Sequence, residues 1–161
     1  MLRLRKIEPT DLPYLYQGEN DARMWADSNT HNPLSKADLH QYIESTTGDI
    51  YRDGQLRLMI EDEGVSMGCI DLFDFDPRNR KAAIGMYIAP HARGKGIGRQ
   101  SVRLLEEYAF DFLKLRMLYA IIAQQNIVCS TIYEKEGYHP SSLLHAWTLE
   151  DNAILWQKWR D

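Results

Sequence analysis

The residues best suited to chemistry form a glycine-rich stretch in the middle of the chain. A strand ends at Pro90, because proline lacks the N–H that a strand ladder needs, and an amphipathic helix is predicted to follow. Glycines at alternate positions leave backbone N–H groups uncovered where a helix begins, and the helix dipole points at the same place. With its basic side chains, this stretch predicts a pyrophosphate site. Its members are Arg93, Gly94, Lys95, Gly96, Ile97, Gly98 and Arg99.

Two better-known phosphate loops do not fit this stretch. No Gly-Lys-Ser/Thr follows a four-residue gap, which excludes a P-loop. The third glycine falls at Gly98, whereas the dinucleotide fingerprint requires it at position 99. For any single glycine, a tight strand-to-helix connection is the plainer interpretation. The whole pattern, placed between a terminated strand and a helix, favours phosphate binding.

At this stretch, and at a second one further along, the chain resembles the GNAT family of N-acetyltransferases. The family's acetyl-CoA signature is Gln or Arg, two residues, Gly, one residue, then Gly or Ala. The second family pattern is Asn, then Tyr seven positions on, then Glu-x-x-Gly-Phe or Tyr. Within the family, the stretch from Met67 to Gly98 looks most like the spermidine N-acetyltransferases. The matching residues are Arg93, Gly96, Gly98, Asn126, Tyr133, Glu134, Gly137 and Tyr138.

The resemblance implies acetyl-CoA as a cosubstrate and gives roles to particular residues. The pantetheine arm would lie between splayed parallel strands, Ile84–Ala89 and Met117–Ala123, and bind unpaired backbone groups. Tyr133 would donate a proton to the coenzyme sulfur, since a phenol of pKa ~10 can protonate a thiolate of pKa ~8.5 only slightly uphill. The predicted coenzyme contacts are the glycine-rich stretch together with Met86, Tyr87, Ile88, Asn126 and Lys135.

Carboxylates are the candidates for the acceptor side, because a protonated amine must lose a proton before it attacks. Asp71 and Asp74 are the candidate bases, in a strand where Asp is unusual. Side chains alternate, so both face one cleft only if the strand bulges, and a solubilised edge strand is the alternative. Glu19, Trp25 and Asp27 are candidate substrate-binding residues through charge pairing and cation–π contact, and a solvated loop with one anchoring tryptophan fits them too.

The elements that position these residues predict one α/β (α+β) domain spanning residues 1–161. We expect the GNAT fold: a mixed, mostly antiparallel sheet of six or seven strands, with splayed central parallel strands and about four helices. Glu63-Gly64 predicts a hairpin turn between two strands. Helices are predicted after Thr10 or Asp11, after Ser35, after the glycine-rich stretch and after Asn126.

Composition narrows the range of partners. A net charge of −4 gives no electrostatic support for nucleic-acid binding and suits a small cationic substrate somewhat better. No apolar run approaches the ~20 residues that span a bilayer. Cys69, Cys129 and five histidines show neither a disulfide framework nor metal-ligand spacing, so we expect no metal and a reducing cytoplasm. A homo-oligomer, a dimer or larger, stays open, because the aromatic C-terminal strands could pair between subunits.

Three functions are compatible with these observations. The first is acetyl-CoA-dependent N-acetylation of a primary amine, a polyamine or diamine such as spermidine, by direct attack in a ternary complex. The second is acetylation of protein N-termini, as in ribosomal-protein acetyltransferases. The third is a non-catalytic acyl-CoA-sensing domain, which fits least because Tyr133 and an unbroken glycine loop are both present.

Overall fold

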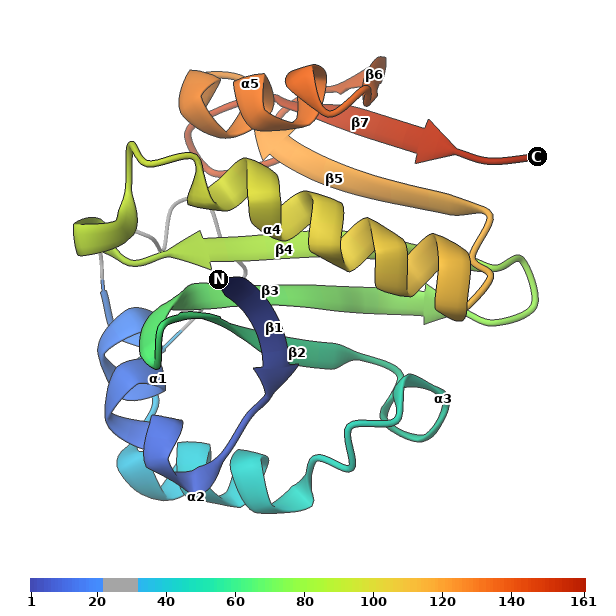
Figure 1. Ribbon diagram of the computed structural model, residues 1–161. Coiled ribbons are helices and arrows are strands. Elements are labelled where there is room, and N and C mark those ends of the chain that lie inside the picture. The colour runs from blue at the N-terminus through green and yellow to red at the C-terminus, as the bar shows by residue number, and fades with distance from the viewer. Residues whose placement is uncertain (22–31) are drawn as a thin grey trace.

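The computed structural model describes residues 1–21 and 32–161, and its strands form one seven-stranded sheet (Figure 1). The strand order is β1-β2-β3-β4-β5-β7-β6. Every neighbouring pair is antiparallel except β4 and β5, which are parallel, so the predicted mixed, mostly antiparallel sheet is confirmed. The strands are β1 (Leu2–Lys6), β2 (Leu56–Asp62), β3 (Val65–Asp76), β4 (Lys81–Ile88), β5 (Met117–Ala123), β6 (His139–Leu144) and β7 (Ala153–Trp159).

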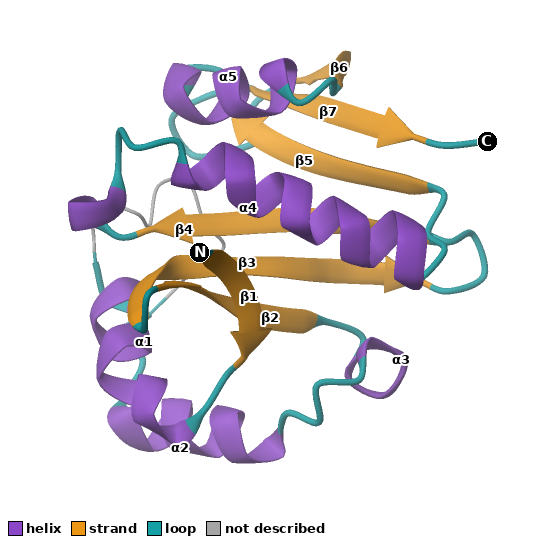
Figure 2. Cartoon of the chain, in the orientation of Figure 1, coloured by secondary structure: helices purple, strands orange, loops and turns teal. Residues whose placement is uncertain are grey.

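The described residues contain five α-helices, one more than the four expected from periodicity (Figure 2). The additional helix is α3, a single turn that Asp49 caps by accepting from the Tyr51 N–H and that Gly54 ends in a left-handed conformation. One turn is too short to show apolar periodicity, which is why the sequence did not reveal it. The helices are α1 (Leu12–Glu19), α2 (Lys36–Ser45), α3 (Ile50–Asp53), α4 (Ile97–Glu106) and α5 (Ile127–Lys135), and α4 continues into the π-helical segment η4 (Glu107–Phe112).

The parallel strands β4 and β5 pair over three residues only. Their register joins Lys81–Ala83 to residues 117–119, although β4 continues to Ile88 and β5 to Ala123. Beyond this point the two strands point the same way but separate, as Figure 1 shows. The predicted splay is therefore present. Backbone groups on the facing edges of both strands lose the ladder partners that a parallel neighbour would supply.

Each face of the sheet carries its own layer of helices. Ile70 and Leu72 of β3 belong to the larger core, which includes Val102 and Leu105 of α4. The alternate residue Cys69 belongs to the second core, together with residues of α1 and α2. Consecutive side chains of a strand point to opposite faces. The point where β4 and β5 separate therefore connects the α4–α5 face with the α1–α2 face.

Candidate active site

A cavity of about 1070 Å³ occupies the place where β4 and β5 separate. Residues 83–87 of β4 and 119–123 of β5 form its walls. Asn126, Cys129 and Tyr133 line it from the α5 side, and Glu19, Arg57, Asp71 and Asp74 line it elsewhere. We call the glycine-rich loop (residues 93–99) and the α5 residues the donor side, and the four charged residues the acceptor side.

The glycine-rich loop has the backbone geometry that an anion site requires. Gly94 and Gly96 both adopt left-handed conformations, with φ of 74° and 77°, and Gly96 is the N-cap residue of α4. The first helical hydrogen bond runs from the Gln100 N–H to the Gly96 carbonyl. The N–H groups of residues 97–99 therefore lie in the first turn, where a helix supplies no partners of its own. The positive end of the dipole of α4 lies at the same place.

Gly98 has a packing role that the motif alone did not reveal. A Cβ atom at this position would lie 2.9 Å from Ile132 Cδ1 of α5 and 3.3 Å from Met86 Cε of β4. The missing side chain lets α4, α5 and β4 meet closely at the mouth of the splay. Gly98 thus helps to set the distance between the two halves of the donor side.

The basic residues of the loop differ in how firmly they are held. The Arg93 Nε donates to the Ile88 carbonyl at 2.9 Å, and its guanidinium lies over the Tyr87 ring. The Arg99 Nε donates to Glu136 Oε1 at 2.7 Å, which fixes its guanidinium beside the start of α4. Lys95 is exposed. The loop keeps a positive charge on each side of its N–H groups.

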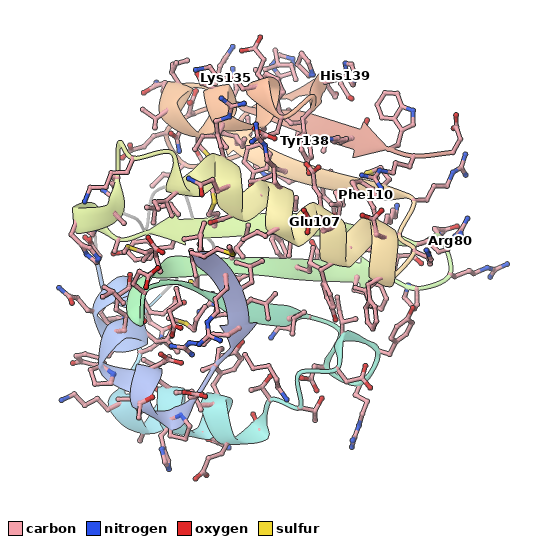
Figure 3. The ribbon with its side chains drawn as sticks, viewed as in Figure 1. Arg80, Glu107, Phe110, Lys135, Tyr138 and His139 are labelled. Carbon is pink, nitrogen blue, oxygen red and sulfur yellow. The ribbon has the colours of Figure 1, made fainter. Side chains whose placement is uncertain are left out.

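Lys135 lies apart from the cavity. It is an exposed residue of α5 (Figure 3) and is the last residue of that helix. Asn126 is the N-cap residue at the other end of the same helix. Among the predicted coenzyme contacts, Met86, Tyr87 and Asn126 line the cavity. Ile88, Lys135 and the loop residues lie outside its lining. The roles of all these residues remain predictions.

Tyr133 lines the cavity while its side chain is almost fully buried, with 1% of the residue exposed. Its ring packs edge-on against the ring of Tyr138, with centroids 5.1 Å apart. The helix that carries Tyr133 is capped as predicted, because the Asn126 side chain accepts from the Cys129 N–H. Burial raises the pKa of the Tyr133 phenol well above its usual value, so the hydroxyl stays protonated at neutral pH.

The acceptor side contains an ion-pair cluster that sequence reasoning missed. Both oxygens of Asp71 accept hydrogen bonds from Arg57, from Nε and from Nη2, each at 2.8 Å. The Arg57 Nη1 donates to Glu19 Oε1 of α1. Arg57 stands directly opposite Asp71 in the β2–β3 register, which is why their side chains share a face. A charged residue among the apolar residues 56–60 of β2 was the available signal.

Asp74 also lines the cavity, because β3 bulges as the two-acid hypothesis required. The β3–β4 register shifts between Phe73 and Asp76, and Asp74 lies in a left-handed conformation with φ of 47°. Within residues 1–21 and 32–161, no hydrogen bond or ion pair to the Asp74 carboxylate is seen. Its charge is close to Tyr119, whose pKa is raised by burial and, secondarily, by Asp74. Asp74 is thus the better placed of the two candidate bases.

Two further groups at the cavity were not singled out from sequence. The Tyr14 hydroxyl is buried and has no hydrogen-bond partner in the described structure, although Tyr14 lines the cavity. The turn between β6 and β7 contributes residues 147–150 to the lining. The splayed strand edges, the start of α4 and this orphaned hydroxyl fit a long ligand rich in amides and phosphates. The substrate-binding candidates Trp25 and Asp27 lie outside the described residues.

Two further observations concern metal ligands and membrane helices in the described part of the chain. It contains no group of three or more His, Cys, Asp or Glu side chains placed to hold a metal ion. None of its helices has the length and apolar character needed to cross a membrane.

Comparisons with known proteins agree with this geometry. Residues 1–139 match the acetyltransferase (GNAT) domain family. The spermidine N(1)-acetyltransferase of Escherichia coli K12 is 28% identical over 140 residues, which cover 85% of this chain and 72% of that protein.

Two solved structures share the fold. The spermidine N-acetyltransferase of Vibrio cholerae, in complex with CoA and spermine, superposes with a TM-score of 0.89 at 21% identity and covers 98% of this chain and 95% of that one. A ribosomal L7/L12 α-N-protein acetyltransferase in complex with CoA gives a TM-score of 0.85 at 17% identity and covers 99% of this chain and 94% of that one. The chain therefore belongs to the GNAT family and is an N-acetyltransferase with acetyl-CoA as its donor.

Proposed function

We propose that the chain acetylates a primary amine of a small cationic molecule, a polyamine or diamine such as spermidine. The observation that supports this most is the single cavity that joins Tyr133 on the donor side to the carboxylates of Glu19, Asp71 and Asp74 on the acceptor side. A cationic acceptor is attracted to such a wall, and its amino group is brought to the place where the thioester would lie.

The residues of the cavity can serve each need of direct transfer. A carboxylate removes the proton that keeps the acceptor amine from attacking, directly or through a water molecule. The amine nitrogen then bonds to the thioester carbonyl carbon, and the carbon–sulfur bond breaks. Backbone N–H groups of β4 near Tyr87, beyond its last ladder pair with β5, can polarise the carbonyl oxygen. Tyr133 gives its phenolic proton to the departing thiolate. The nitrogen loses its second proton as the amide forms, and a proton taken up from solvent restores the phenol.

Burial of Tyr133 modifies the expected proton balance. The raised pKa of the phenol makes it a weaker acid than an exposed tyrosine. A thiolate that forms inside the same cavity also loses its hydration, and desolvation raises the pKa of a thiol in the same direction. The two effects offset one another, so proton transfer from Tyr133 stays compatible with its buried position.

Asp74 is the carboxylate that we assign to the acceptor amine. Asp71 shares both of its oxygens with Arg57, so it is committed to an ion pair. Asp74 lies exposed in the bulge of β3 and lines the same cavity. An exposed carboxylate at the cavity can accept a proton from the amine and pass it to solvent.

Acetylation of protein N-termini is the second candidate, and Arg57 is the observation that favours it. The Arg57 guanidinium neutralises part of the acidic wall that a polyamine would need. A likeness in fold to the ribosomal L7/L12 enzyme is compatible with this alternative.

Self-association through the C-terminal strands also stays a proposal, supported by the exposed edge strand β6 and by the half-exposed Trp159 of β7.

The test is release of free thiol from acetyl-CoA with a panel of acceptors: spermidine, spermine, putrescine, a lysine-containing peptide and a peptide with a free N-terminus. We expect saturable release with the polyamines. Release with peptides alone would move the function to protein acetylation. Tight acetyl-CoA binding without release for any acceptor would contradict the polyamine proposal and would leave either an acceptor outside this panel or the sensing domain.

Two matched variants locate the base in the same assay. Asp74→Asn keeps a residue that tolerates the left-handed conformation, so it removes the charge with little backbone strain. We expect it to lower kcat/KM for the amine about tenfold or more, whereas the KM for acetyl-CoA stays unchanged. Asp71→Asn is expected to act through Arg57 and to destabilise the fold as well. An unchanged rate for Asp74→Asn would exclude Asp74 as the base.

A further inference from the structure

Arg57 occupies the position in the acceptor side where a ligand cation would be expected to bind. Its guanidinium is held by two carboxylates from different elements, Glu19 of α1 and Asp71 of β3. All three side chains are only partly exposed, at 20% for Arg57 and 23% for each acid. These carboxylates therefore bind a cation that belongs to the chain.

The ion-pair cluster also lies between two cavities. A second cavity of about 350 Å³ adjoins the α2 side and is lined by Asp38 and Tyr42, among others. Both cavities share the same four lining residues: Glu19, Arg57, Asp71 and Phe73. The Arg57 side chain thus contributes to the walls of both cavities.

We propose that Arg57 is a specificity-determining residue, whose guanidinium holds the place between Glu19 and Asp71 that the second ammonium group of an extended acceptor would take. This inference rests on the proposed amine acceptor. In the unmodified chain, Arg57 lowers the affinity for multiply charged amines relative to the affinity for singly charged ones.

The physical basis is competition between a tethered cation and a free one. Two carboxylates and one guanidinium give the cluster a net charge of −1, whereas the carboxylates alone would carry −2. The guanidinium is attached to β2, so its effective concentration at the carboxylates is high. Its planar fork matches both Asp71 oxygens, and an ammonium group cannot reproduce that geometry. A second ammonium therefore gains little at this wall while Arg57 is in place.

Removing the cation should make the acceptor side selective for polycations. In Arg57→Met the two acids still line both cavities, but the Arg57 guanidinium no longer lies between them. The second ammonium of a polyamine then gains a partner, whereas an amine with a single charge gains none. Arg57→Lys is the matched control, because it keeps the positive charge on the same strand.

The experiment measures equilibrium binding of spermidine and of n-butylamine to the full chain in the presence of coenzyme A. For Arg57→Met we expect spermidine to bind at least tenfold more tightly than to the unmodified protein, and butylamine to change by less than about twofold. Arg57→Lys should keep the spermidine affinity within about threefold. Unchanged or weaker spermidine binding by a folded Arg57→Met protein would overturn the proposal.

Loss of a buried ion-pair partner can unfold a protein, so a second variant protects the test. Arg57→Gln keeps an amide donor for Asp71 while it removes the charge, and we expect the same change in the spermidine-to-butylamine ratio. Thermal unfolding of each variant identifies which proteins are folded under the assay conditions. An unchanged spermidine-to-butylamine affinity ratio in folded Arg57→Gln protein would also overturn the proposal.

Binding and turnover together separate this inference from the proposed function. If the ratio shifts but no protein acetylates any amine, the acceptor class is wrong and the selectivity role of Arg57 stands. If amines are acetylated and the ratio does not shift, the role of Arg57 is wrong and the acceptor class stands. Absence of amine binding by any of the proteins would contradict both.

Discussion

The donor side takes its residues from two short runs of chain, whereas the acceptor side takes Glu19, Arg57 and Asp71 from three elements that are distant in sequence. The glycine-rich loop and the start of α4 are one continuous segment. Asn126 is the N-cap residue of α5, and Tyr133 lies within the same helix. Backbone groups dominate the donor side, and side-chain charges dominate the acceptor side. Substitutions on the two sides should therefore change different kinetic constants.

The difference also concerns how each side tolerates change. A cradle of backbone N–H groups depends on dihedral angles, so it fails when a left-handed residue gains a side chain. An ion-pair cluster depends on a balance of charges, so it fails when one member is removed. The variants of Asp74 and Arg57 described above test the acceptor side, and the three predictions below test the donor side and the ion pair beside it.

Tyr133→Phe should have the largest effect, because it removes the proposed proton donor and little else. The ring contact with Tyr138 and the buried volume are kept. We expect kcat to fall about 100-fold, in the range typical of general acid catalysis, with acetyl-CoA binding unchanged. Tyr138→Phe is the matched control, since Tyr138 lies outside the cavity lining, and it should keep kcat within about twofold. Steady-state kinetics give kcat, and a titration gives the affinity for acetyl-CoA. An unchanged kcat for Tyr133→Phe would show that the proton comes from another group.

Gly96→Ala and Gly64→Ala compare a glycine of the donor side with a glycine of a distant turn, and both substitutions place alanine in the same strained backbone conformation. The two glycines have φ of 77° and 78°, and a Cβ atom at either would meet no close neighbour. Each substitution should therefore cost a similar ~1–2 kcal/mol of stability. Only Gly96 precedes the first turn of α4, so only Gly96→Ala should raise the KM for acetyl-CoA, by about fivefold. If Gly64→Ala, in the β2–β3 turn, raised it equally, the effect would come from general destabilisation.

Glu136→Gln should have the smallest effect, and its signature is pH dependence. Burial acts to raise the pKa of Glu136, but hydrogen bonds from Arg103 and Arg99 outweigh it and hold the pKa below the usual 4.5. A lowered pKa in the folded state stabilises the protein above pH 4.5, and this contribution is lost as the pH falls through the folded value.

Thermal unfolding at several pH values tests this prediction. The unmodified protein should have a higher Tm than Glu136→Gln at pH 7, and the gap should shrink below pH 4.5. The KM for acetyl-CoA should rise only a few-fold, because Arg99 loses a charged partner but keeps its place on α4. A Tm gap that is constant with pH would show that the Glu136 charge does not contribute.

The donor side could be predicted from sequence because its determinants are local. A proline that ends a strand, alternate glycines and an Asn cap act within a few residues, and the structure places Gly96 and Asn126 at helix starts as expected. The strand predicted over Met117–Ala123 also has the same bounds as β5. What the sequence left unseen there is the contact between Gly98 and Ile132, which depends on how two helices pack.

The acceptor side depends on strand register, which a bulge changes without a visible mark in the sequence. The Glu63-Gly64 turn pairs Asp62 with Val65 and, continued regularly, would place Arg57 opposite Ile70. A bulge between Ile60 and Glu61 shifts the register by one and brings Arg57 opposite Asp71. The Arg57 pair was therefore missed, although both residues lie in strands that were predicted correctly.

The three-residue pairing of β4 with β5 also divides the sheet into two units that are consecutive in sequence. Strands β1 to β4 come from residues 2–88 and strands β5 to β7 from residues 117–159, and every other strand pair lies within one of these two groups. Apart from this short ladder, the groups are joined mainly by the packing of helices against both. A molecule that fills the space between β4 and β5 supplies the missing contacts across this boundary. We therefore expect the two units to open separately in the free protein and to unfold together when the donor is bound.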